Sequence, residues 1–382
     1  MFPGRRDFSK VRIILPLFTT LLLLSLVLAG PVSAQFTEFE AAIAKFDAEV
    51  AAGVAEDAAG CVSIAVFIGN DVVWAKGYGW ADIENRIAAT EETIGRIGSI
   101  SKSFTAVAMV QLVERGIFGF DDPVADYFPE IKGIVDTIGV DQPITFRMLA
   151  SHTSGLIREP RLRGAASGSI YFWEDKILES IPTTFFFAPP LTKYQYSNIG
   201  FGILGLASSR AANVPFMELV TENIFKPLGM TSSTFILNSP ELWARMSVGY
   251  NRTRSGVSAA AATREHFGRG YKVPNGGIYS TVLDLAKFAA AIMGESPVKI
   301  LSTESLAEIT TPQPPAGGYG LGFSLGERGG LKTVGHGGSV AGYNANLSFN
   351  PDTKIGVAML RTTGYNPDTG TLLRELVAAY KN

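Results

Sequence analysis

Strand-like segments lie near both ends of this 382-residue chain, and a long helix-rich stretch separates the two groups. Near the start, residues 62–67 and 72–78 are rich in β-branched and aromatic side chains, and Gly69-Asn70-Asp71 between them is typical of a hairpin turn. Near the end, four more strand-like segments cover residues 319–325, 331–334, 343–350 and 354–361. Because strands must pair to satisfy their backbone groups, we expect one antiparallel sheet built from both chain ends.

Apolar residues at helical spacing predict the elements that flank this sheet. The predicted helices cover residues 39–55, 99–115, 199–212, 216–225, 280–293 and 370–380. The expected fold is of the α/β (α+β) class: an antiparallel sheet built from both chain ends, flanked by helices, with an inserted helical lobe. We predict an α/β lobe from residues 35–150 and 278–382, a helical lobe from residues 151–277, and a functional site in the cleft between them.

The first 34 residues have the pattern of a secretory signal peptide. Arg5, Arg6, Lys10 and Arg12 precede an apolar stretch over 13–29, and Val32-Ser33-Ala34 predicts cleavage before Gln35. We therefore expect an exported protein, periplasmic or extracellular, with no stable membrane span in its mature form. An uncleaved membrane anchor is the alternative. Residues 4–10 also resemble the twin-arginine export motif, so the export route stays open.

Composition excludes several classes of protein. The formal charge is −2, and loss of the signal peptide makes it −5, because four basic residues and one acidic residue are removed. This balance predicts no nucleic-acid binding. The single cysteine, Cys61, lies in an apolar segment and is predicted to be buried and unreactive. Its spacing from the three histidines suits no metal site, so neither a metal nor another cofactor is expected. His266 lies in the glycine-rich segment 255–275, which we predict to be a mobile surface loop.

Three short motifs could carry chemistry. In Ser99-Ile100-Ser101-Lys102 the spacing places a hydroxyl and an amine on one helix face, and a desolvated lysine can take the serine proton. In Tyr196-Ser197-Asn198 the tyrosine could relay a proton and the asparagine could contact a substrate amide. In His336-Gly337-Gly338-Ser339 the glycines would let a substrate lie against the backbone, where a free N–H can complete an oxyanion hole.

Taken together and in this order, the three motifs resemble those of the serine β-lactamase and penicillin-binding protein superfamily. The similarity is to its class C β-lactamase-like branch, which includes D,D-carboxypeptidases, D-aminopeptidases and family VIII esterases. Five further segments resemble the family's landmarks: Gly77-Tyr78-Gly79-Trp80-Ala81-Asp82, Arg96-Ile97-Gly98, His152-Thr153-Ser154-Gly155-Leu156, Pro227-Leu228-Gly229-Met230 and Gly277-Ile278-Tyr279. The resemblance therefore extends over nearly the whole chain after residue 34.

The resemblance implies a β-lactamase/transpeptidase-like fold and a set of roles. It implies that Ser99 forms an acyl-enzyme, that Lys102 is its activating base and that Tyr196 is the proton shuttle. Asn198, His336, Gly337, Gly338 and Ser339 are the implied substrate-binding residues, with the backbone N–H groups of Ser99 and Ser339 as the oxyanion hole. His152 is implied to fix a loop.

One position departs from the family pattern. Class C β-lactamases have a lysine where this chain has His336, and a histidine that titrates near neutrality is a weaker partner for a carboxylate. The change argues against an efficient β-lactamase, although a true β-lactamase stays among the alternatives. We expect a serine hydrolase acting on a small-molecule ester, peptide or β-lactam. The alternative is a penicillin-binding or sensor-type protein that is acylated without efficient turnover. The oligomeric state stays open.

Overall fold

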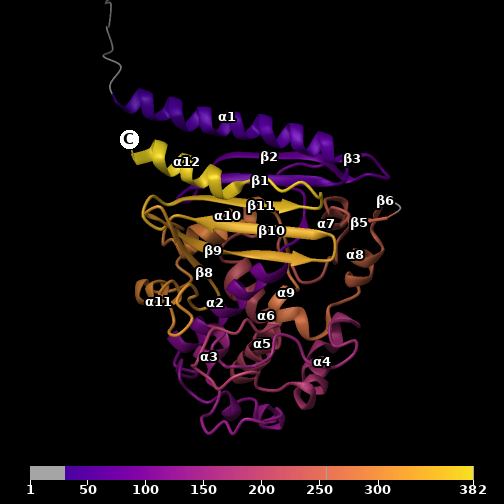
Figure 1. The fold of residues 1–382 in the computed structure, drawn as a ribbon, viewed down its shortest axis with the longest axis vertical. Coiled ribbons are helices and arrows are strands. Elements are labelled where there is room, and N and C mark those ends of the chain that lie inside the picture. Colours follow the sequence, from indigo (N-terminus) through magenta and orange to yellow (C-terminus); the bar gives the residue numbers. More distant parts are fainter. Residues whose placement is uncertain (1–30, 255, 382) are drawn as a thin grey trace, which may run out of the picture.

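The computed structural model describes residues 31–254 and 256–381. The predicted signal peptide therefore lies mostly outside the described residues, and residues 31–34 belong to the first helix. The main sheet has seven strands in the order β3-β2-β1-β11-β10-β9-β8 (Figure 1). Its strands are β1 (Cys61–Ile68), β2 (Asp71–Asp82), β3 (Ile87–Ala88), β8 (Ser324–Arg328), β9 (Leu331–Val340), β10 (Tyr343–Phe349) and β11 (Ile355–Arg361).

The two ends of the chain meet in the middle of this sheet. Strand β1 pairs antiparallel with β11 from Val62↔Arg361 to Ile68↔Ile355. On the other side of β1, β2 follows directly through a two-residue turn in which Gly69 has a positive φ of +57°. All pairs within the sheet are antiparallel. The prediction of one antiparallel sheet built from both termini is confirmed.

Helices α1 (Pro31–Asp57) and α12 (Thr369–Lys381) cover one face of the sheet, which we call the outer face. In Figure 1 they lie next to each other along the top of the molecule, beside β1 and β2. Their apolar side chains pack on alternate residues of β1 and β11 in a separate core cluster. That cluster includes Phe46, Val50, Val62, Ile64, Val357, Met359, Leu372 and Leu376. The burial of both helices explains why their apolar spacing was visible in the sequence.

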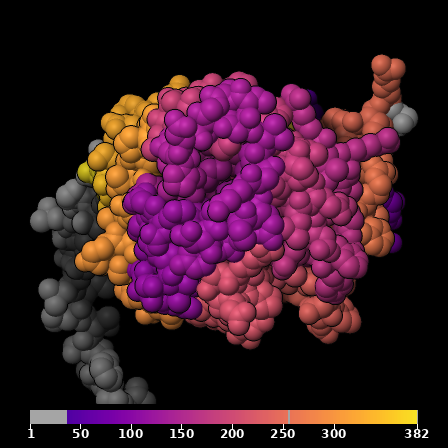
Figure 2. Space-filling view, turned by 90° about the horizontal axis from the view of Figure 1, so that it is seen from below, coloured from indigo at the N-terminus to yellow at the C-terminus, as the bar shows by residue number. Residues whose placement is uncertain are grey.

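The opposite, inner face of the sheet packs on α2 (Ser101–Glu114) and α10 (Val282–Ile292). Phe104 of α2 stacks on Phe288 of α10 with ring centroids 3.8 Å apart, and this layer continues into the helix-rich part of the chain. Figure 2, a view from below, shows that part as the purple-to-salmon surface, with orange C-terminal residues at one side. The remaining helices are α3 (Phe146–Ala150), α4 (Trp173–Ser180), α5 (Asn198–Ala212), α6 (Phe216–Val220), α7 (Pro240–Ala244), α8 (Ala260–Glu265), α9 (Val273–Gly276) and α11 (Thr303–Ile309).

Two strand boundaries differ from the prediction. The strand predicted over 331–334 continues to Val340, because the glycine-rich segment His336–Ser339 keeps pairing with β10, for example Gly338↔Ala345. The strand predicted over 319–325 begins only at Ser324, because positive φ angles at Gly317 and Gly322 turn the chain before it can pair. The fold class is confirmed, whereas the division between lobes at 150/151 and 277/278 stays a prediction.

The predicted surface loop at 255–275 is wrong in its second half. The segment forms the short strand pair β5 (Asn251–Thr253) and β6 (Gly256–Ser258), then α8, and then the buried helix α9. His266 is not solvated: its Nδ1 lies 2.8 Å from the Tyr279 hydroxyl, and burial lowers its pKa to about 4. Tyr279 belongs to β7 (Tyr279–Ser280), which pairs with β4 (Gly95–Arg96). Among the residues described, no helix is long and apolar enough to cross a membrane.

Candidate active site

Ser99 lies on a single 3-10 turn, η1 (Gly98–Ile100), that leads directly into α2. This turn packs closely against β9, and two glycines permit the contact. A Cβ atom on Gly338 would collide with the carbonyl oxygen of Ile97, and one on Gly98 would lie 2.7 Å from the backbone nitrogen of Ser339. Gly98 also has a positive φ of +52°. The backbone nitrogens of Ser99 and Ser339 therefore border the same contact between η1 and β9.

Lys102 stands one turn after Ser99 and is fully buried. Its Nζ lies 3.0 Å from Ser99 Oγ and 3.0 Å from the carbonyl oxygen of Asn275. Burial lowers the pKa of Lys102 well below its usual value, and the positive charges of Arg269, Lys272 and Arg158 lower it further. An amine so placed loses its proton more readily than an exposed lysine, so it can accept one from the neighbouring hydroxyl.

Tyr196 lies beside the same pair. Its ring centroid is 4.8 Å from Lys102 Nζ and 4.6 Å from the guanidinium carbon of Arg158. Burial raises the pKa of Tyr196, and this effect outweighs the opposing effects of a hydrogen bond with Ser99 and of the Arg158 charge. Its hydroxyl therefore keeps its proton at neutral pH. The two groups next to Ser99 differ accordingly: the lysine loses its proton more readily and can then accept one, whereas the tyrosine holds its proton and has one to pass on.

Asn198 is the first residue of α5, which Ser197 caps by accepting a hydrogen bond from the Gly200 N–H. The Asn198 amide donates to Glu159 Oε1 at 2.6 Å, and Glu159 also pairs with Lys272 at 3.0 Å. Asn198 Oδ1 is buried and has no hydrogen-bond partner within the described part of the chain. The structure therefore places Asn198 beside the site with its amide group already engaged, and its contact with substrate stays a prediction.

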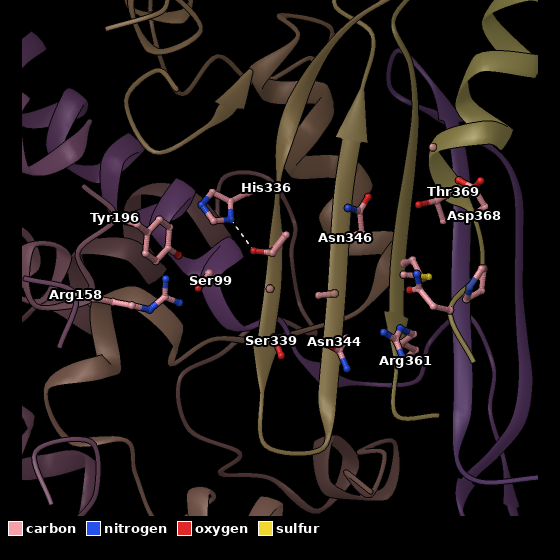
Figure 3. A pocket seen from close by; sticks show the side chains of 17 residues that line it. Ser99, Arg158, Tyr196, His336, Ser339, Asn344, Asn346, Arg361, Asp368 and Thr369 are labelled. Atoms are coloured by element: carbon pink, nitrogen blue, oxygen red, sulfur yellow. Dashed lines mark hydrogen bonds between the residues drawn. The ribbon is translucent and has the colours of Figure 1, made fainter. Parts of the chain in front are cut away.

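His336 lies within β9, where it is largely buried and forms part of the cleft wall. Its Nδ1 is 2.6 Å from the Gly337 carbonyl oxygen, drawn as the dashed line in Figure 3, and its Nε2 is 3.0 Å from the Tyr319 hydroxyl. Burial and the Lys102 charge lower the pKa of His336 to about 4, against a weaker opposing effect of the Gly337 hydrogen bond. Nδ1–H thus donates to Gly337 and Nε2 accepts from Tyr319. The expectation of a histidine that titrates near neutrality is wrong: His336 is neutral at pH 7.

His152 packs on Tyr196, with ring centroids 4.2 Å apart, and Cys61 lies on β1. His152 is buried and its Nδ1 accepts a hydrogen bond from the Ser197 N–H at 3.0 Å, a contact that suits the predicted loop-fixing role. Cys61 is buried on β1, and burial raises the pKa of its thiol to about 11, so the predicted buried, unreactive cysteine is confirmed. Within the described residues, no group of three or more His, Cys, Asp or Glu side chains could hold a metal ion.

A cleft of about 740 Å³ opens at Ser99. Figure 3 shows Ser99, Tyr196 and Arg158 at one end, His336 and Ser339 on β9, and polar side chains of β10 and β11 beyond them. The cleft is lined by Ser99, Arg158, Tyr196, His336, Gly337, Gly338, Ser339, Asn344, Ala345, Asn346, Met359, Arg361, Asn366, Pro367, Asp368, Thr369 and Gly370. The predicted residues are thus brought together, except that Lys102 and Asn198 lie behind the lining.

Sequence reasoning missed several residues that the structure places at this site. Arg158 and Glu159 follow the predicted loop-fixing segment, and Arg269 lies in the segment predicted to be a surface loop. None of the three belongs to a spaced motif, so the sequence carried no signal for them. For Asn344 and Asn346 a signal was present: polar and apolar residues alternate along 343–349, which indicates a strand with one polar face.

Comparison with known proteins places the chain in a family. The profile of the Beta-lactamase family matches residues 46–381. "Beta-lactamase-like protein 4" of Dictyostelium discoideum is 30% identical over 340 residues, covering 81% of this chain and 58% of that protein. "D-alanyl-D-alanine-carboxypeptidase/endopeptidase AmpH" of Escherichia coli (strain K12) is 30% identical over 229 residues, covering 59% of this chain and 56% of that protein. The chain thus spans somewhat more than half the length of these two relatives.

A solved structure agrees with the sequence comparisons. The octameric penicillin-binding protein homologue from Pyrococcus abyssi superimposes with a TM-score of 0.72 at 28% identity, covering 88% of this chain and 76% of that chain. This chain belongs to the Beta-lactamase family, within the superfamily of serine β-lactamases and penicillin-binding proteins. The resemblance inferred from the three motifs is confirmed.

Proposed function

We propose that the protein is an exported serine hydrolase that cleaves an ester or amide through an acyl-enzyme on Ser99. One observation carries the proposal: the buried Lys102 amine lies 3.0 Å from the Ser99 hydroxyl at the mouth of the cleft. A serine hydroxyl becomes a useful nucleophile only when a neighbouring base removes its proton. The direction of the Lys102 pKa shift supplies that base.

The reaction would proceed in two halves. Ser99 Oγ attacks the substrate carbonyl carbon while its proton passes to Lys102 Nζ, and the N–H groups of Ser99 and Ser339 stabilise the resulting oxyanion. The carbon–oxygen or carbon–nitrogen bond then breaks, and Tyr196 delivers a proton to the leaving group and regains one from Lys102. In the second half, a water molecule attacks the acyl carbonyl, loses its proton to the same pair of residues and releases Ser99.

The comparisons and the N-terminus support the wider proposal. The E. coli relative is named as a carboxypeptidase/endopeptidase, which favours an amide or ester substrate over a purely binding role for this chain. Export rests on the signal-peptide pattern of residues 1–34. We further propose that the cleft lies between the α/β lobe (35–150 and 278–382) and the helical lobe (151–277). Asn198, His336, Gly337, Gly338 and Ser339 would position the substrate there.

The test is the hydrolysis of p-nitrophenyl butyrate by the protein starting at Gln35. Ser99→Ala should lower kcat/KM by about 10⁴-fold or more, since removal of the nucleophile of a serine hydrolase has an effect of this order. Ser258→Ala, in the β5–β6 hairpin, is the matched control and should keep wild-type activity. Full activity of Ser99→Ala would disprove the assignment. A stoichiometric burst with labelled penicillin, without steady-state turnover of any ester, would instead indicate the penicillin-binding type.

A further inference from the structure

The cleft continues past Ser99 onto the outer face of the sheet. The pairing register aligns Ser339, Asn344 and Arg361 in one row across β9, β10 and β11, and Gly337, Asn346 and Met359 in the next. All six residues line the cleft (Figure 3). Neighbouring strands lie about 4.8 Å apart, so the backbones of Ser339 and Arg361 are separated by about 10 Å.

The floor of this extension is open and polar. Gly337 is exposed, and a Cβ atom added to it would meet nothing within 4 Å, so a ligand can cross β9 there without obstruction. Beyond it stand the half-buried side chains of Asn344 and Asn346. No hydrogen bond recorded for the described residues engages either side-chain amide. Each therefore offers one acceptor and two donor hydrogens to a ligand.

Arg361 supplies a positive charge at the far end, and the charge of Asp57 acts on it without forming a salt bridge with it. The side chain is half-buried, its Nη1 donates to the carbonyl oxygen of Thr363 at 2.6 Å, and its Nε is buried with no hydrogen-bond partner in the described residues. Within the same residues it forms no salt bridge. The neighbouring carboxylate, Asp57, is engaged instead by Arg252 and by the Gly364 N–H.

The acidic residue of the groove, Asp368, has hydrogen-bond partners of its own. Asp368 accepts hydrogen bonds from the Thr371 N–H at 2.9 Å and the Thr371 hydroxyl at 2.6 Å, so its charge caps the start of α12. Two arginines line the cleft, one at each end. Arg158 is exposed and pairs with Glu159 at 3.8 Å, whereas Arg361 is half-buried and forms no salt bridge within the described residues. Partly buried guanidinium groups without a carboxylate partner are well suited to bind one from a ligand.

We propose that this extension is a subsite for the distal part of the substrate, which carries a carboxylate about 10 Å from the bond that is cleaved. The carboxylate binds Arg361, and amide or hydroxyl groups between it and the scissile carbonyl bind Asn344 and Asn346. The inference rests on the proposed function, because it takes Ser99 as the point of cleavage. It adds a substrate class: elongated, polar and anionic at the end remote from the reaction.

A series of esters of increasing length measures the distance between the bond that is cleaved and the site that binds the carboxylate. One set carries the carboxylate on the acyl chain, as p-nitrophenyl hemiesters of adipic, suberic, sebacic and dodecanedioic acids. The second set carries it on the alcohol, as acetate esters of ω-hydroxy acids of matching length. Each ester is compared with its neutral ω-methyl ester. In at least one set, kcat/KM for the acid should exceed kcat/KM for its methyl ester by about tenfold at the lengths that span the groove, and by less at shorter lengths. A charge-assisted hydrogen bond has an effect of this order.

Four variants assign the effect. Arg361→Gln should abolish the length-dependent preference for the acid over its methyl ester, and Arg361→Lys should retain part of it. Arg374→Gln removes the same charge from α12 at a residue outside the cleft lining and should behave as wild type, with p-nitrophenyl butyrate as well as with the long acids. Arg158→Gln tests the other arginine of the cleft lining. The proposal is overturned if the preference for the acid is lost in Arg158→Gln but kept in Arg361→Gln. It is also overturned if the preference does not depend on chain length in either set of esters.

Failure of the subsite can be told from failure of the proposed function. If butyrate is hydrolysed in a Ser99-dependent way but the ester series shows no length dependence, the proposed subsite is wrong and the proposed hydrolase function is retained. If no ester is turned over, the same acids and methyl esters are titrated into Ser99→Ala by calorimetry. Binding of the long acids about tenfold tighter than of their methyl esters, lost on adding Arg361→Gln, supports the subsite even then. Equal affinities for the acids and their methyl esters refute it.

Discussion

The two ends of the cleft differ in how deeply their side chains are buried. At the Ser99 end, Lys102 is fully buried and both of its acceptors, Ser99 Oγ and the Asn275 carbonyl, lie at 3.0 Å. At the Arg361 end, the side chains are half-buried and the amides of Asn344 and Asn346 face open space. In the proposed mechanism, burial at the first end favours proton transfer from Ser99 to Lys102, whereas exposure at the second end leaves side chains free to bind a ligand. The proposed bond cleavage and the proposed recognition of the substrate carboxylate therefore take place at opposite ends of one groove.

The difference follows from which elements cover the sheet. Helix α2 is buried along most of its length, so a lysine on it has no route to solvent. On the outer face, α1 and α12 pack over β1 and β11 and leave the β9–β10 side exposed (Figure 1). One end of the cleft is therefore a helix terminus sealed by packing, and the other is an uncovered part of a sheet.

The largest expected effect comes from removing the buried amine. Lys102→Met should lower kcat/KM for p-nitrophenyl butyrate by about a thousandfold, because general-base catalysis contributes an effect of this order. The free energy of unfolding should not fall, since a buried amine is replaced by an apolar side chain of similar size. Steady-state kinetics and urea unfolding measure the two quantities.

The same variant sharpens the comparison between the two ends. A calorimetric titration with decanoic acid, which has the length of sebacic acid but neither an ester nor an amide bond, should give the same dissociation constant for Lys102→Met and the wild type. A large loss of this affinity would show that the two ends are not independent. Near-normal turnover by Lys102→Met would remove the lysine from the proposed mechanism.

An intermediate effect is expected from Arg269, which we regard as a positioning residue. Its Nη1 donates to the Gly276 carbonyl at 2.9 Å, next to the Asn275 carbonyl that contacts Lys102, and it pairs with Glu265 at 3.0 Å. Its charge is one cause of the lowered pKa of Lys102. Arg269→Gln should therefore raise the Lys102 pKa and shift the acidic limb of the pH profile of kcat/KM to higher pH.

Charge can be separated from shape at this position. Arg269→Lys keeps the positive charge, so its acidic limb should stay at the wild-type pH even if its rate falls. Lys299→Gln, an exposed lysine distant from the cleft, should leave the profile unmoved. If Arg269→Gln lowers the rate equally at every pH, the residue acts only by holding the 275–276 backbone.

The smallest effect is expected from His336, which lies between the two ends. Because burial and the Lys102 charge lower its pKa to about 4, the ring stays neutral from about pH 6 to pH 8. The ratio of kcat/KM for the sebacate hemiester to that for its methyl ester should be constant over this range. A ratio that rises as the pH falls through about 6.5 would mean that a protonated His336 binds the carboxylate.

The sequence was sufficient where a feature is local or strongly periodic. The three-residue spacing from Ser99 to Lys102 brings the two side chains together on any helix, and the structure adds only the 3-10 turn at Gly98. The strands at both ends were visible because their side chains face packed helices on one or both sides. The hairpin at Gly69 followed from turn chemistry alone.

What could not be predicted depends on contacts between distant segments. The neutral state of His336 is set by burial and by Lys102, which lies more than two hundred residues earlier. The hydrogen bond from Asn198 to Glu159 joins the start of helix α5 to a loop 39 residues earlier. The continuation of β9 through two glycines requires a partner strand, β10, whose register no local pattern specifies.

The pairing of β1 with β11 has a consequence for how the molecule is made. Cys61 and Thr362, hydrogen-bonded across this pair, are 301 residues apart, so the sheet cannot close until almost the whole chain has been synthesised. Contacts between such remote segments slow folding, because a long loop must be closed before they form. A nascent or truncated chain that ends before residue 331 has the serine and the lysine but neither β9 nor its share of the oxyanion hole. If Ser99 is the nucleophile, as proposed, hydrolytic activity would therefore appear only after β9 has been synthesised and paired.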